Sequence, residues 1–104
     1  MVLKSSVAFE SVPARIALPA VRFRRPGGVP QAAVWCPTCR TIHIHGDPGG
    51  GATRWRVHDY VDNRFRDHPS EYLLFFVGSV STPGNAPRLT IDEAIAFDAR
   101  VNRA

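Results

Sequence analysis

The chain has 104 residues, a formal net charge of +4 and 44% hydrophobic residues, which is enough apolar material for one domain with a core. Its longest apolar run, residues 72–77, is far shorter than the roughly 20 residues that a membrane-spanning helix needs. The first six residues lack the apolar stretch of a secretory signal, so we expect a cytoplasmic protein.

The first 30 residues contain four prolines among short apolar runs. Proline has no N–H to donate, and it is therefore disfavoured in the middle of a sheet. We expect residues 1–30 to form extended segments and edge strands. Within them, residues 21–24 alternate apolar and basic side chains, which is typical of a half-exposed strand.

Residues 31–80 are expected to form the β core. The run 41–45 alternates apolar and polar residues, and 54–60 resumes an extended pattern after the glycine-rich connection 46–53. A hairpin between these two runs is one arrangement that the connection allows. Residues 72–77 are the best candidate for a central buried strand, because their apolar character is continuous.

The sequence Thr90-Ile91-Asp92-Glu93 is a capping box that predicts a C-terminal helix over residues 90–102. Its apolar stripe at helical spacing consists of Ile91, Ala94, Ile95, Phe97 and Val101. Asp98 falls within this stripe. We therefore predict a single α+β domain over residues 1–104, with an antiparallel sheet and one C-terminal helix.

Both cysteines and two of the four histidines occur between residues 36 and 45. Cys36 and Cys39 are three positions apart, a spacing that lets two thiolates bind one ion from a tight turn. Pro37 stiffens such a turn, and its missing N–H is not needed there. Sulfur and imidazole ligands together favour Zn²⁺. The segment therefore predicts a zinc site, closed and structural.

The remaining ligands must come from the histidines. His43 and His45 lie on one face of the predicted strand, about 6.5 to 7 Å apart. If residues 46–53 close a hairpin, His58 on the partner strand also comes within range. His68 lies in a turn and is the weakest candidate. We expect the ligands to be Cys36, Cys39, His45 and His58, with His43 as the alternative to either histidine.

Other interpretations of the cysteine pair remain open. A thioredoxin-like dithiol needs a helix after the cysteines to lower the thiol pKa, whereas residues 41–45 alternate as a strand does. A zinc deaminase needs a histidine before Cys36, and the sequence has none there. Two buried cysteines with unrelated surface histidines are the plainest alternative. We therefore do not expect an enzyme. A metal-dependent enzyme ranks third, after a nucleic-acid-associated protein and a protein-binding module.

Twelve of the thirteen basic residues are arginines, and several of them flank aromatic residues. Arginines at alternate strand positions share one face of the strand. This arrangement suits contacts to phosphate better than stacking on bases, which would need the aromatic residues on the same exposed face. The candidate nucleic-acid-binding residues are Arg22, Arg24, Arg25, Arg54 and Arg56. An ordinary solvated strand face is the alternative interpretation.

The pattern Cys-Pro-x-Cys-x-x-x-His-x-His-Gly after a tryptophan resembles small uncharacterised zinc-ribbon-like proteins of actinobacteria and their phages. The resemblance covers residues 35–58 and includes Gly46 and Arg56-Val57-His58. It implies a zinc-ribbon-like fold and a mobile-element origin. We expect a small zinc-binding accessory or regulatory protein associated with nucleic acid. The alternative is a phage- or mobile-element-encoded module that binds a host protein through its apolar, proline-rich N-terminal third.

Overall fold

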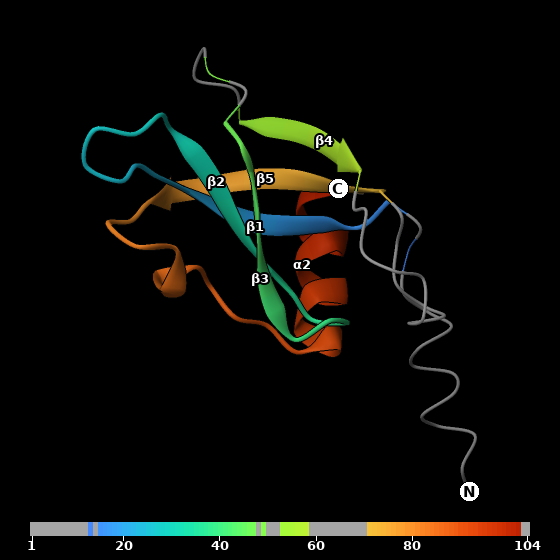
Figure 1. Cartoon of the computed structure of the whole chain (residues 1–104). Helices are drawn as coiled ribbons and strands as arrows, with labels where there is room; N and C mark the ends of the chain where they lie inside the picture. The colour runs from blue at the N-terminus through green and yellow to red at the C-terminus, as the bar shows by residue number, and fades with distance from the viewer. Residues whose placement is uncertain (1–12, 14, 48, 50–52, 59–70, 103–104) are drawn as a thin grey trace, which may run out of the picture.

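The computed structural model of the chain describes residues 13, 15–47, 49, 53–58 and 71–102, with the backbone alone for 55–58. Five strands and one α-helix dominate the described part (Figure 1). The elements are β1 (Ala17–Phe23), β2 (Gln31–Cys36), β3 (Thr41–Gly46), β4 (Arg54–His58), β5 (Glu71–Ser79), a short 3₁₀ turn η1 (Pro83–Asn85) and α2 (Ile91–Asn102). The predicted α+β class is confirmed.

The described strands form one sheet in the order β3-β2-β1-β5-β4. Neighbouring strands run antiparallel, except that β1 and β5 are parallel. The strand predicted over residues 72–77 is therefore an interior strand, because β5 has β1 on one side and β4 on the other. Tyr72, Leu74 and Phe76 are buried at alternate positions along it, as the period of a strand requires.

The expectation that the first 30 residues supply only extended segments and edge strands is wrong for residues 17–23. They form β1 in the middle of the sheet, with Pro19 inside the strand. The ladder to β2 begins only at Ala20, so the nitrogen of Pro19 lies outside that ladder. Its missing N–H therefore removes no hydrogen bond to β2.

The hairpin that the connection allows between residues 41–45 and 54–60 does not form. β3 pairs with β2 and β4 pairs with β5, so the two strands are at opposite edges of the sheet. The glycine-rich connection was compatible with a hairpin, but partner choice in a sheet depends on strands that are far apart in sequence. The structure therefore does not supply the strand pairing that made His58 a neighbour of His43 and His45.

The apolar side chains form two clusters. The larger one contains Ile16, Leu18, Ala20, Ala32, Val34, Tyr72, Leu74, Phe76 and Ala94. The smaller one contains Val21, Phe23, Ala33 and Ala86. Adjacent residues of a strand point to opposite faces, so Ala20 and Val21 place the two clusters on the two faces of the sheet.

Helix α2 begins as the sequence predicts. Thr90 N donates to Glu93 Oε1 over 2.8 Å, and Glu93 N donates to Thr90 Oγ1 over 3.1 Å, which are the two bonds of a capping box. The helix packs against β1, behind the sheet in the view of Figure 1. Asp98 holds the two elements together, because its buried Oδ1 accepts the backbone N–H of Ala17 over 2.8 Å.

Candidate metal centre

Both cysteines lie at the turn that joins β2 to β3. Cys36 is the last residue of β2, and Cys39 follows it within the turn. The N–H of Cys39 donates to Cys36 Sγ over 3.4 Å, and the N–H of Arg40 donates to Cys36 O over 2.7 Å. An amide dipole aimed at sulfur stabilises the thiolate form that binds a metal. The two sulfur atoms are not joined in a disulfide bond.

Arg40 closes this turn in the left-handed conformation, with φ of 57°. It is the one non-glycine residue with positive φ among the described residues. Such a conformation is unfavourable for a side chain with a Cβ atom and persists where the surrounding structure requires it. Here it turns the chain back toward β3, whose first residue, Thr41, pairs with Cys36.

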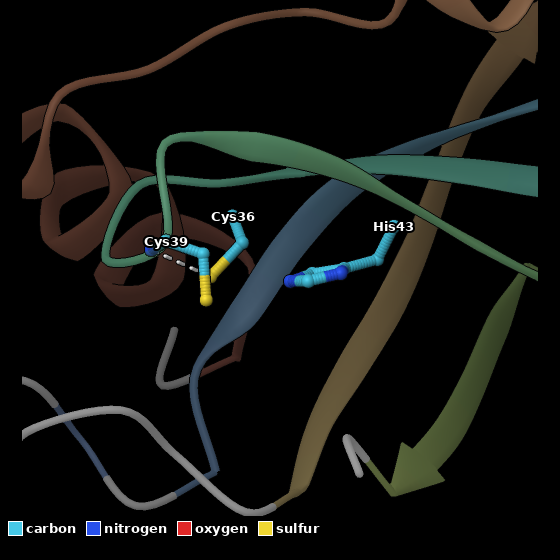
Figure 2. Close-up of side chains that lie close together, drawn as sticks. All are labelled: Cys36, Cys39 and His43. Carbon is cyan, nitrogen blue, oxygen red and sulfur yellow. Dashed lines mark hydrogen bonds between the residues drawn. The ribbon is translucent and has the colours of Figure 1, made fainter. Parts of the chain in front are cut away.

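The β2–β3 register brings a histidine to the cysteines. His43 lies directly opposite Val34, and Cys36 follows Val34 by two positions, so Cys36 and His43 share one face of the sheet. The ligand atoms of Cys36, Cys39 and His43 all lie within 4.8 Å of one another. Figure 2 shows the two sulfur atoms next to each other, with the ring of His43 pointing toward them. The three side chains could therefore hold one metal ion.

The donor set and its spacing fit a tetrahedral ion. Bonds of about 2.3 Å to sulfur and about 2.0–2.1 Å to nitrogen separate neighbouring ligand atoms by roughly 3.5 to 3.8 Å. The separations here, at most 4.8 Å, need an adjustment on the order of 1 Å or less to reach that geometry. Cys36 is buried, whereas Cys39 and His43 are half-buried, so the site lies at the margin of the core.

The other histidines are placed differently. His45 is outside this group, and its Nε2 forms a 2.6 Å hydrogen bond with the hydroxyl of Tyr72. His58 is in β4, where its backbone pairs with Glu71, and its side chain is not described. His68 lies outside the described residues. The structure thus brings together Cys36, Cys39 and the histidine that the sequence ranked as the alternative ligand.

Tyr72 is a neighbour of the site that the sequence did not reveal. It is fully buried on β5, and its ring stacks beside that of His43 at a centroid distance of 6.5 Å and 25° between planes. It meets the ring of His45 edge-on at 5.6 Å. The alternation along β5 predicts an inward-facing tyrosine, but its contact with β3 depends on how the sheet curves, which sequence patterns do not encode.

Arg22, a candidate for binding nucleic acid, is engaged within the molecule. Its Nε is 3.0 Å from Asp47 Oδ2, and its guanidinium carbon lies 3.8 Å from the centre of the Phe76 ring. The side chain is half-buried, and these two contacts fix it against the sheet. Arg22 is therefore poorly placed to act as an independent phosphate ligand.

The other candidate arginines are more exposed. Arg24 and Arg25 follow the end of β1, and both are exposed. Arg54 is exposed too, and its Nη2 donates to Val101 O over 2.9 Å. Arg56 is in β4, where only the backbone is described. Among these four, Arg24 and Arg25 belong to one continuous exposed segment, residues 24–30.

Within the described residues, no helix is both long and apolar enough to cross a lipid bilayer. Comparisons of the chain with protein-family models, with curated proteins and with solved structures give no match.

Proposed function

We propose that this protein is a small zinc-binding domain that serves as a nucleic-acid-associated accessory protein, with zinc in a structural role. The observation that carries the zinc proposal is the convergence of Cys36, Cys39 and His43 within 4.8 Å at the β2–β3 turn. We propose a cytoplasmic location, where reducing conditions keep the two thiols available for a metal. Kinship with the zinc-ribbon-like proteins of actinobacteria and their phages is part of the same proposal.

Zinc is the metal that this donor set favours. Two thiolates and an imidazole are soft and borderline ligands, which suit Zn²⁺ better than Mg²⁺ or Ca²⁺. The two thiolates would neutralise the charge of the ion, so the surplus of +4 would stay available for an acidic partner. The case for His58 as the fourth ligand rested on pairing between residues 41–45 and 54–60, and β4 pairs with β5 instead, so the ligands proposed here are Cys36, Cys39 and His43.

A structural role follows from where the three donors lie. Cys36 is 1% exposed, and it is the last residue of β2. Ala32 and Val34 of the same strand belong to the larger cluster. An ion there would tie the turn to the third residue of β3. Structural zinc contributes ~10–16 kcal/mol in small peptides, against a stability of ~5–15 kcal/mol for a whole domain. Zinc would therefore be a large part of this domain's stability.

Metal analysis tests the zinc proposal. The purified wild type should contain about one zinc ion per chain, and a chelator should lower its melting temperature. In Cys39→Ser the chelator should change the melting temperature little, because the variant lacks one thiolate. Thr38→Ala is the matched control, since Thr38 is in the same turn but supplies no ligand. A folded wild type without metal, insensitive to the chelator, contradicts the proposal.

Nucleic-acid association is supported by charge and exposure. The chain carries a net charge of +4, and Arg24, Arg25 and Arg54 are exposed. Contacts to phosphate release counterions, so affinity for a DNA duplex should fall steeply between about 50 and 200 mM salt. Fluorescence anisotropy with a labelled duplex measures this dependence. An absence of binding at the lowest salt argues against this part of the proposal.

A further inference from the structure

The connection between β1 and β2, residues 24–30, is the most prominent exposed loop of the described part. Every residue in it is exposed, and Figure 1 shows the loop extending beyond the end of the sheet. Its sequence, Arg-Arg-Pro-Gly-Gly-Val-Pro, contains two basic residues and no acidic one. Val29 is 74% exposed, the highest value among the large hydrophobic residues that are exposed. We call residues 24–30 the arginine loop.

The arginine loop has a defined backbone. Gly28 N donates to Arg25 O over 2.8 Å, which closes a four-residue turn. Pro26 takes the second position of this turn and Gly27, with φ of +75°, the third, as a type II turn requires. At Gly28 a Cβ atom would lie 3.3 Å from Arg25 O, closer than most such contacts. The glycines and the proline thus select one conformation for the loop.

Arg25 is anchored to the two strands that carry the loop. Its guanidinium carbon lies 5.4 Å from the centre of the Phe23 ring at the end of β1, and its Nη1 donates to Gln31 Oε1 over 3.2 Å at the start of β2. The side chain is nevertheless exposed, as is that of Arg24. A positively charged group held in place loses less conformational entropy when a ligand binds.

We propose that the arginine loop is the element that contacts phosphate groups of a double-stranded nucleic acid. This inference rests on the proposed nucleic-acid association and assigns it to one part of the surface. It attributes the contact to Arg24 and Arg25, and it leaves Arg22 to its structural contacts with Asp47 and Phe76.

A duplex suits this surface better than a single strand does. Proteins that bind single strands stack bases on exposed aromatic side chains. Among the residues whose side chains are described, every aromatic ring is buried or half-buried; they are Phe23, Trp35, Tyr72, Phe75, Phe76 and Phe97. The partly exposed face of Trp35 is approached by Arg88, whose guanidinium carbon is 4.9 Å from the ring centre. The described surface therefore offers charge to a phosphate backbone and little stacking area.

The test compares two double variants in the full chain. Arg24→Ala/Arg25→Ala removes the charges of the loop, and Arg88→Ala/Arg100→Ala removes two exposed arginines that also lie over aromatic rings. A labelled 20-base-pair DNA duplex of mixed sequence is titrated at several salt concentrations. Each lost phosphate contact lowers the slope of log affinity against log salt by about 0.9, so the loop variant should lose about 2 and the control much less.

Three results are informative. The variant Arg24→Lys/Arg25→Lys should retain the wild-type slope, because it keeps both charges. The melting temperature and zinc content of each variant verify that it is folded. An unchanged slope in the loop variant, with a reduced slope in the control, overturns the inference while nucleic-acid association stands. A wild type that does not bind the duplex at low salt overturns both.

Discussion

Arg40 gives the cysteine turn its shape. With φ of 57° it occupies a region that costs roughly 1–2 kcal/mol for a residue with a Cβ atom. Its N–H completes the turn by donating to Cys36 O over 2.7 Å. The turn that holds both cysteines therefore depends on a backbone conformation that glycine would adopt more easily than arginine does.

The left-handed conformation of Arg40 predicts an unusual order of stability among variants at this position. Arg40→Val should be less stable than Arg40→Gly by about 1 to 2 kcal/mol, because a β-branched residue tolerates positive φ poorly. Chemical denaturation of the zinc-loaded variants measures the difference. At Thr41, the first residue of β3, Thr41→Val should instead be more stable than Thr41→Gly, since valine is favoured in strands. An equal effect of both substitutions at position 40 contradicts the left-handed turn.

The two histidines of β3 should differ in their effect on metal binding. Changes in residues that merely orient a ligand lower metal affinity by about 10–100-fold. Because His43 is itself a proposed ligand, His43→Ala should lower the affinity by more than that. His45→Ala should leave the metal content near the wild-type level, because Nε2 of His45 bonds to Tyr72. A zinc-competition assay measures both. The opposite order would make His45 the ligand, as the spacing of the histidines also allows.

Helix α2 is joined to the sheet through a buried polar contact. Asp98 is 1% exposed, and its Oδ1 accepts the N–H of Ala17 over 2.8 Å and the Nδ2–H of Asn102 over 3.1 Å. Phe97 meets Phe75 edge-on at a centroid distance of 5.8 Å beside it. A polar residue inside the apolar stripe of the helix thus binds the first N–H of β1.

Removal of this contact should weaken the whole domain. In Asp98→Ala the N–H of Ala17 remains buried without its acceptor, so the free energy of unfolding should fall by about 1–3 kcal/mol. Asp92→Ala is the control, since Asp92 is exposed in the first turn of α2 and acts mainly on the helix dipole. Urea unfolding of both variants provides the comparison. Equal stability of the two variants would mean that the Asp98 contact contributes little.

Local patterns predicted the elements better than they predicted their partners. The capping box at Thr90 and Glu93 gave the start of α2, because both of its bonds lie within four residues of chain. The central position of β1 was missed, because Pro19 signals an edge unless the ladder is known to start at Ala20. The cysteine turn was predictable from spacing, whereas the choice between His43 and His45 depends on the register between β2 and β3.

The three metal donors lie within a segment of eight residues, 36–43, at one edge of a five-stranded sheet. β1 and β5 contribute Leu18, Leu74 and Phe76 to the larger cluster, and of the three donors only Cys36 is fully buried. The metal would therefore tie one end of the β2–β3 hairpin directly, and it would act on the remaining strands through the pairing of β2 with β1.

This arrangement predicts which strands lose protection from amide hydrogen exchange first when zinc is removed. Hydrogen exchange after addition of a chelator should accelerate at the amides of β3 before it does so in β5, because β3 is an edge strand without a fully buried residue and the donors join it to β2. The same measurement on the zinc-loaded protein is the reference. Uniform acceleration across all strands would instead mean that the domain unfolds as one unit without the metal.

X-ray absorption at the zinc edge identifies and counts the atoms bound to the ion, and it therefore distinguishes a site with two thiolates from any other. We expect two sulfur neighbours at about 2.3 Å and nitrogen at about 2.0–2.1 Å around the ion in the wild type. A first shell of nitrogen and oxygen without sulfur, or a folded protein that takes up no zinc, would contradict it.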